Sequence, residues 1–475
     1  MSDTIEMDAP DTLTPDATLT PDAPGADEPC FNFTDTGNAK RMVAMYGDDL
    51  RWLSDTDSFV AWDGSVWRPS KDGTFLLPWT SDVAESIADP KWQKISESLG
   101  KRKAMIALLK GEQPVWSESK NFDTHPMLLN VANGTLDLET QTLRDFNRAD
   151  LLSKQAPVLY DPAAKCPQFD AFLNLIFGGN QETIRFMLAA LGYTLTGSVG
   201  ESCFFLCYGL GANGKTTLLE VLMLILGRDL AYPAKFSTFV ESKMFDQKYE
   251  LAKCKGMRLV IASEPSKAGQ LDAVTLKQIT GGDQINTRNI YQENSVYYPE
   301  FKLWFAANSE PRISDTDDGI WRRVHKINFN VQIPKAQQIP EFHKVLFAKE
   351  GSGIVNRLLE GIHAWQEDGH LIMPPEVQDA TDKFRLSQNV IEDFFDTYCT
   401  VGKPNLHAKM GFLYLAYKSW AEVRGETVLR TNEFAEVLDR RPGLKRKSVW
   451  HDGMHCFGLT LKSQPMEDSP VVFEN

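Results

Sequence analysis

The chain has 475 residues, of which 42% are hydrophobic and 24% charged, and its formal net charge is −14. This length allows about two to four domains with cores of their own. No apolar run is long enough to cross a membrane, and the first residues lack the basic-then-apolar order of a signal peptide. The seven cysteines are too scattered for a zinc site or a disulfide framework. We therefore expect a soluble, cytoplasmic protein with no membrane partner.

The first segment, residues 1–29, is an acidic leader. It holds eight acidic residues and no Lys or Arg, so it accounts for more than half of the net charge. It also repeats the letters TLTPDA at 12–17 and 18–23. A segment of this composition cannot bury a core, so we predict that it is disordered. The remaining chain is much closer to neutral, which leaves a nucleic-acid partner open.

Two segments precede the most informative motif. Residues 30–118 are rich in Trp and Gly and predict a small α+β module, in which 62–67 form a tight hairpin. Residues 119–200 predict a mostly helical domain that begins with a short strand-and-turn piece. Its apolar residues recur at helical spacing over 168–177 and 181–196.

Residues 209–216 (GLGANGKT) follow an apolar, strand-like run and precede a helical run that Gly227 closes. In such a loop, glycines let backbone N–H groups face a triphosphate, the lysine reaches the β- and γ-phosphates, and the hydroxyl holds Mg²⁺. A chance glycine-rich turn is the alternative, but the strand and the helix in their proper places argue against it. The predicted ATP ligands are Gly209, Gly211, Ala212, Asn213, Gly214, Lys215, Thr216 and Thr217, and the predicted Mg²⁺ ligands are Thr216 and Glu264.

Two more apolar runs end in polar residues: 257–264 ends in Glu264, and 301–308 ends in Asn308. A parallel sheet places such strand ends beside the phosphate loop. Glu264 is then a candidate to polarise the attacking water, and Asn308 a candidate to orient it. An exposed strand-end acid and an ordinary turn asparagine are the alternatives. We predict a nucleotide-hydrolysing core over 201–335.

Arg322 and Arg323 stand where a loop returns to a strand. The guanidinium fork suits the charge that develops on a transferring phosphoryl group, and it can be supplied by a neighbouring subunit. Taken alone, however, an ordinary pair of surface arginines is the better interpretation. The catalytic candidates are thus Glu264, Asn308, Arg322 and Arg323.

The last part of the chain predicts a helical connector over 336–385 and then a winged helix over 386–475, because three helices are followed by a β-pair, 448–450 with 456–461. Five basic residues and no acid lie between the presumed recognition helix, about 431–440, and the wing. Such a cluster supplies contacts to phosphates, although a merely soluble loop is possible. Trp450, His451 and Phe457 could stack on bases or pack the wing, and we expect packing.

Several motifs appear together in a specific order. They are 276–283 (LKQITGGD) with Arg288 beyond it, 301–308 followed by Pro311, and 317–324 (DDGIWRRV). With the phosphate loop they resemble the helicase half of phage and plasmid primase-like proteins, relatives of the poxvirus-type helicases in superfamily 3. Residues 133–137 (NGTLD) and 192–197 (GYTLTG) resemble the helical domain that precedes the ATPase in that family.

The resemblance implies an α/β P-loop core of the AAA+-like type, with ATP held between subunits. It assigns Glu264 as the acid of the second motif, Asn308 as the sensor, and Arg322 or Arg323 as a finger acting in trans. Segment 284–302 would be a hairpin in the central channel of a ring. Many ring ATPases of this superfamily have two adjacent acids in the second motif, whereas here a serine precedes Glu264, so direct Mg²⁺ contact stays open. The predicted DNA contacts are Lys277, Arg288, Arg440, Arg441, Lys445, Arg446 and Lys447.

The sequence therefore predicts an ATP-dependent, ring-forming DNA helicase, expected to be a hexamer, that acts on single-stranded and forked DNA in phage, prophage or plasmid replication. Residues 30–120 are too few for a primase domain, so we expect no primer synthesis by this chain; a separate primase or initiator would be a further partner. Two alternatives remain. One is an origin-melting initiator or loader, and the other is a DNA-binding regulator with a nucleotide switch.

Overall fold

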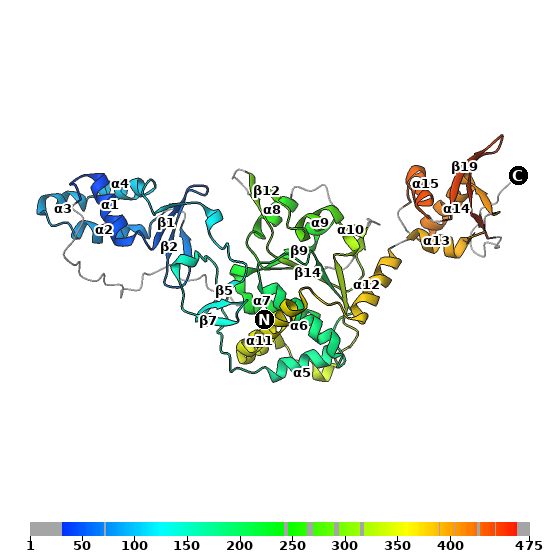
Figure 1. Cartoon of the computed structure of the whole chain (residues 1–475), viewed down its shortest axis with the longest axis horizontal. Coiled ribbons are helices and arrows are strands. Elements are labelled where there is room, and N and C mark those ends of the chain that lie inside the picture. The colour runs from blue at the N-terminus through cyan, green and yellow to red at the C-terminus, as the bar shows by residue number, and fades with distance from the viewer. Residues whose placement is uncertain are drawn as a thin grey trace, which may run out of the picture. The chain divides into compact units, whose positions relative to one another are not determined.

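The computed structural model describes residues 31–70, 73–241, 246–263, 269–288, 294–313, 318–388, 390–403, 405–424, 428–441 and 443–462. The predicted acidic leader, 1–29, lies outside these residues. The chain divides into two compact units, Met1–Thr381 and Asp382–Asn475 (Figure 1). Within the described ranges, no helix combines the length and the apolar character that crossing a membrane requires.

The first unit begins with the predicted α+β module. Its four-stranded sheet has the order β3-β2-β1-β4, and the predicted hairpin is formed with Trp62 opposite Trp67. Trp67 is buried, and its indole N–H donates to the carbonyl of Arg148 at 2.9 Å. The elements are α1 Asp35–Tyr46, β1 Leu50–Leu53, β2 Ser58–Trp62, β3 Trp67–Ser70, α2 Leu76–Glu85, α3 Pro90–Ser96, α4 Leu99–Leu109 and β4 Trp116–Ser117.

The segment 119–200 begins with strands, as its predicted strand-and-turn start indicated, and it is α-helical only from Pro167 onward. Before that point, β5 Leu128–Val131, β6 Gly134–Asp137 and β7 Thr142–Arg144 form a three-stranded antiparallel sheet. Short apolar runs separated by tight turns favour strands here. The two predicted helices follow as α5 Pro167–Ile176 and α6 Gln181–Leu195.

The centre of the first unit is a five-stranded sheet of order β16-β8-β14-β10-β9, in which every neighbouring pair is parallel. Its inner strands read as continuous apolar runs because both faces are covered. The edge strand β9 was not predicted; it contains Pro233, which an edge strand tolerates. The strands are β8 Phe204–Tyr208, β9 Ala231–Lys235, β10 Leu259–Ser263, β14 Lys302–Ala307 and β16 Val324–Asn328.

On one side of this sheet lie α6, α7 Lys215–Leu230 and α11 Phe342–Asp368 (Figure 1). The side chains of these helices share one hydrophobic core with the sheet. Helices α6 and α11 approach closely, since a Cβ added to Gly361 would lie 2.1 Å from the carbonyl oxygen of Leu188. Helix α11, which makes up most of the predicted connector, is thus packed into the core of the first unit.

The remaining short elements of the first unit surround the sheet. Strands β12 and β13 form an antiparallel hairpin, and β11 pairs with β15. Their bounds are α8 Asp246–Lys253, β11 Gln270–Leu271, α9 Ala273–Thr280, β12 Ile285–Arg288, β13 Asn294–Tyr297, β15 Arg312–Ile313 and α10 Asp318–Trp321. Helix α12, Pro375–Ser387, begins in the first unit and ends in the second.

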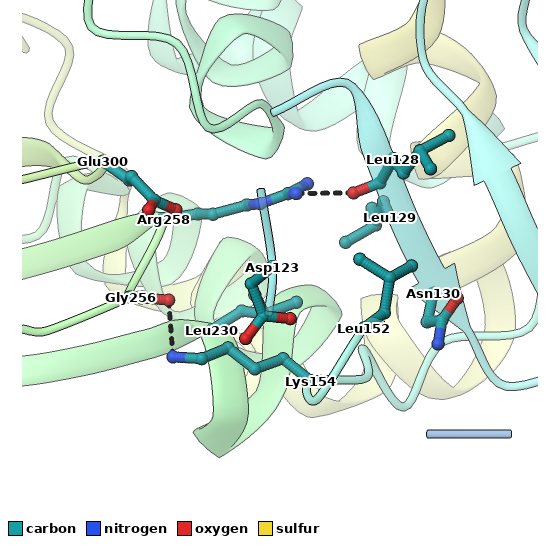
Figure 2. A pocket seen from close by; sticks show the side chains of 10 residues that line it. All are labelled: Asp123, Leu128, Leu129, Asn130, Leu152, Lys154, Leu230, Gly256, Arg258 and Glu300. Atoms are coloured by element: carbon teal, nitrogen blue, oxygen red, sulfur yellow. Dashed lines mark hydrogen bonds between the residues drawn. The ribbon is translucent and has the colours of Figure 1, made fainter. Parts of the chain in front are cut away.

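Two buried cations, Arg258 and Lys302, lie at the amino ends of central strands. They bind backbone carbonyls of the chain segment that precedes the sheet in sequence. The Arg258 guanidinium donates to the carbonyls of Leu195 at 2.6 Å and Leu128 at 2.5 Å. The Lys302 ammonium donates to the carbonyls of Thr196 and Ser198. Burial lowers the pKa of Arg258 to about 10 and that of Lys302 well below its usual value. Figure 2 shows the small pocket beside Arg258, in which the Lys154 ammonium reaches the carbonyl of Gly256.

His325 on β16 should make the first unit acid-sensitive. Its ring packs against Phe205 and Phe186, and burial lowers its pKa from 6.5 to about 4. Between those pH values the unfolded chain binds a proton that the folded chain does not, so stability rises with pH across this window. Between pH 6.5 and pH 4, protonation of His325 should lower the parent's free energy of unfolding by about 3 kcal/mol. We expect His325→Phe to lack this part of the decrease, and urea unfolding at both pH values measures it.

The exposed His363 provides the control, because His363→Gln should leave the acid dependence as it is in the parent. An acid dependence in His325→Phe equal to that of the parent would contradict the assignment.

The second unit has the predicted order of three helices and a β-pair. Helices α13 Val390–Tyr398, α14 Met410–Val423 and α15 Thr431–Arg440 pack around a core that includes Phe394, Tyr417 and Phe434. The strands are β17 Cys399–Val401, β18 His407–Lys409, β19 Lys445–Val449, β20 Gly453–Phe457 and β21 Leu459–Leu461. The β-pair lies earlier than expected, so Trp450 lies in the turn between β19 and β20 and not in a strand.

Candidate functional site

The loop 209–214 leaves the carboxyl end of β8 and leads directly into α7, as predicted. Gly211, Ala212 and Gly214 have φ values of 100°, 50° and 85°. Within the described part of the chain, the backbone N–H groups of 210–214 donate to no acceptor. Successive N–H groups of this kind, at the N-terminus of a helix, form a site for an anion.

The loop is held from beneath by two neighbouring segments. Gly214 lies so close to α5 that an added Cβ would be 2.5 Å from the Cγ2 atom of Ile176. The buried Asn213 donates its side-chain amide to the carbonyl of Phe329, and the N–H of Ile333 donates to the carbonyl of Ala212 at 2.7 Å. Sequence reasoning missed this supporting segment after β16, because nothing local in its residues points to the loop.

Lys215 and Asn308 come together, although 93 residues separate them. Lys215 is 4% exposed, and its ammonium donates to the carbonyl of Gly209 at 2.7 Å and to Oδ1 of Asn308 at 2.9 Å. Burial lowers the pKa of Lys215, so a nearby negative charge would stabilise the ammonium. Asn308 follows β14, which pairs with β8, and this pairing places its side chain beside the loop.

The other predicted ligands lie at or near the same edge of the sheet. Thr216 is exposed and Thr217 half-buried in the first turn of α7, while Gly209 is the first residue of the loop, directly after β8. Strand β10 ends at Ser263, which pairs with Ala306. The next residue, Glu264, lies outside the described residues. The loop N–H groups, the Lys215 ammonium and the Thr216 hydroxyl are the groups that could hold a triphosphate and its Mg²⁺.

Arg322 and Arg323 lie immediately before β16, at the amino ends of the parallel strands, whereas the loop lies at their carboxyl ends. The register pairs Val324 with Phe204, at the amino end of β8, while the loop leaves its carboxyl end. A strand of five residues spans roughly 16 Å, which is beyond the reach of an arginine side chain. Neither arginine can therefore contact a phosphate held by the loop of its own chain.

The two arginines differ in their surroundings. Arg322 is exposed, whereas the guanidinium of Arg323 is half-buried close to Gly281 and Asp283. Burial and the neighbouring Arg322 lower the pKa of Arg323. Its buried Nε has no hydrogen-bond partner within the described residues. A buried donor of this kind is available to a ligand or to another subunit.

The two DNA-contact candidates of the first unit lie on neighbouring elements. Lys277 is half-buried on α9, and Arg288 is the last residue of β12. Within the segment 284–302, strands β12 and β13 pair antiparallel with Arg288 opposite Asn294, and 289–293 lie outside the described residues. The side chain of Arg288 lies outside the described residues, so its direction stays a prediction.

The basic cluster of the second unit divides into two sets. Arg446 donates to the Asp439 carboxylate at 2.7 Å, and the Arg441 guanidinium lies 4.6 Å from the ring centre of Phe395. Lys445 and Lys447 are exposed. Successive side chains of β19 point to opposite faces of the sheet. Lys445 and Lys447 therefore share one face, whereas Arg446 points to the other face, toward α15. For Arg440 only the backbone, at the end of α15, is described.

Two family models match the chain. One, described as D5 N terminal like, matches residues 39–178. The other, described as a family of unknown function, DUF5906, matches residues 207–323, which begin in β8 and end at Arg323.

Viral proteins are similar to a large part of the chain. A putative helicase of Acanthamoeba polyphaga mimivirus is 28% identical over 305 residues, which are 59% of this chain and 31% of that protein. A putative helicase of Invertebrate iridescent virus 3 is 24% identical over 68% of this chain and 38% of its own length. A putative primase of African swine fever virus is 22% identical over 63% of this chain and 34% of its own length.

The predicted resemblance to primase-like helicases is confirmed. The chain spans about a third of the length of these viral relatives. Among solved structures, the apo NrS-1 C terminal region has a TM-score of 0.50 at 10% identity, covering 86% of this chain and 96% of that one. This likeness supports the mixed α/β fold.

Proposed function

We propose that this chain is an ATP-driven DNA helicase that acts in the replication of a phage, prophage or plasmid, in the cytoplasm of the host cell. Its core would be a P-loop ATPase of the AAA+-like superfamily 3 type, and its second unit a winged helix. The viral relatives named putative helicases support a helicase-type role in replication. The order of the parallel strands and of the elements in the second unit agrees with this proposal.

The contact between Lys215 and Asn308 carries the proposal. It joins the loop lysine to the polar residue at the end of the neighbouring strand, beside a row of N–H groups that have no acceptor among the described residues. When a triphosphate binds, its charge would replace the carbonyl and amide oxygens as the partner of the Lys215 ammonium. Asn308 would then be free to orient a water molecule, and Glu264 to polarise it. Mg²⁺, held by Thr216, would neutralise charge on the phosphate oxygens.

The position of Arg322 and Arg323 supports a ring. Since neither arginine reaches the loop of its own chain, each can act on a phosphate only from a neighbouring subunit. A closed ring gives every loop such a neighbour, and we propose a hexamer. The β12–β13 hairpin, with Arg288 near its turn, would then enter the central channel and contact single-stranded DNA. Primer synthesis is no part of this proposal.

A measurement of ATP hydrolysis with and without single-stranded DNA tests the proposal. We expect the full chain to hydrolyse ATP with Mg²⁺ and to do so several-fold faster when oligothymidine is added, because translocation couples strand movement to turnover. Duplex DNA of equal nucleotide concentration is the control, and it should stimulate less. Negligible turnover in both cases would instead favour the regulator with a nucleotide switch.

A further inference from the structure

The turn between β19 and β20 presents two aromatic rings to solvent. Trp450 is 87% exposed, and its ring is stacked on that of His451, with centroids 5.1 Å apart and planes inclined by 15°. Our expectation that these aromatics pack the wing is therefore wrong for Trp450. A large apolar side chain that is almost fully exposed calls for a partner, since its burial would be favourable.

The turn holds this pair in place. His451 and Gly453 have positive φ values, which reverse the chain over three residues. Asp452 is drawn back toward the sheet, because its carboxylate lies 2.8 Å from the Lys409 ammonium and 2.9 Å from Nε2 of His455. The turn geometry and the two contacts of Asp452 thus fix the position of the Trp450–His451 pair relative to the sheet.

The sheet face behind the turn is basic and aromatic. Lys445 pairs with Phe457 and Lys447 pairs with His455, so these four side chains share one face. The same register brings His407 of β18 onto it, opposite Phe457. Both lysines are exposed, and the local acid, Asp452, already has two basic neighbours. The two exposed lysines suit the phosphates of a ligand, and the exposed rings of Trp450 and His451 suit its flat rings.

We propose that Trp450 and His451 form a stacking platform for an unpaired nucleobase, while Lys445 and Lys447 hold the adjacent phosphates of the same strand. Exposed aromatics beside basic residues are how proteins bind single-stranded nucleic acid without reading its sequence. A base stacked inside a duplex has no free face, so the platform requires unpaired bases. Such a platform presupposes the proposed function, in which the chain binds DNA.

Binding of two fluorescein-labelled strands to the full chain tests the platform: oligothymidine, and an abasic strand of equal length and charge. We expect Trp450→Ala to weaken oligothymidine binding about tenfold. Binding of the abasic strand, and the salt dependence of both, should not change. Trp450→Phe should restore most of the lost affinity. Phe412→Ala, which removes another exposed aromatic of the second unit, should have no effect.

Replacing Lys445 and Lys447 together with Gln should act differently. It should weaken both strands and reduce the salt slope by roughly 0.7 for each lost contact. If the parent binds oligothymidine and Trp450→Ala binds it equally well, the platform is wrong while the proposed function stands. If the parent binds neither strand, both fail. A Trp450→Ala effect of equal size on the abasic strand would likewise overturn the platform, since it would report a distorted hairpin rather than lost stacking.

Discussion

Replacing Lys215 with Ala should reduce ATP hydrolysis by at least about 10²–10³-fold, the range seen when one preorganised hydrogen-bond donor to a developing charge is removed. The ammonium is buried between two oxygen acceptors at the loop, so no other described cation occupies its place. The loop itself should survive, because Asn213, Gly214 and the segment after β16 hold its backbone. Steady-state phosphate release measures the effect, and circular dichroism checks the fold.

Lys344→Ala provides the matched control, because Lys344 is an exposed lysine in the first turn of α11. It should hydrolyse ATP like the parent. Turnover by Lys215→Ala near the parent rate, in a folded protein, would remove the loop from the reaction.

Replacing the arginine that acts as the finger should lower the rate of ATP hydrolysis by about 10³–10⁵-fold, a loss equal to or larger than that of Lys215→Ala. We expect only one of the two single variants, Arg322→Ala or Arg323→Ala, to lose ATP hydrolysis. Both variants should still bind ATP. The geometry explains why binding should survive: both residues lie a full strand length from the loop of their own chain.

Mixing experiments can show that the finger acts in trans. Rings that combine the inactive arginine variant with Lys215→Ala contain some junctions at which the loop of one subunit and the arginine of its neighbour are both intact. Partial activity should therefore return on mixing. With subunit exchange confirmed by labelled protein, an absence of recovery at every ratio would argue that each chain hydrolyses ATP alone.

Local motifs predicted the order of the elements around the loop 209–214. The strand–loop–helix order and the nearness of Asn308 to Lys215 follow from rules on parallel strand ends, which depend little on distant packing. The role of Glu264, the predicted acid of the second motif, stays a prediction, because this residue lies outside the described residues. The role of 329–333 under the loop could not be predicted, since its contacts are made by backbone groups whose partners are set by the fold.

Other differences have long-range causes. Arg258 directly precedes β10 and Lys302 begins β14, in runs that read as ordinary apolar strands, yet both hold the preceding segment through its carbonyl groups. The basic cluster before the wing looked uniform in sequence, but strand alternation gives Arg446 an acidic partner and leaves Lys445 and Lys447 exposed. A shift of the β-pair by a few residues moved Trp450 from an expected strand into the turn. In each case the deciding neighbour is remote along the chain or depends on register.

The central claim is that ATP hydrolysis drives strand separation. Its most direct test is the release of a labelled strand from a long forked duplex by the full chain, with ATP and Mg²⁺. We predict release that requires hydrolysable ATP and a single-stranded tail, and that is lost in Lys215→Ala. Hydrolysis stimulated by single-stranded DNA without release of the strand would contradict the helicase and favour an initiator that only melts an origin.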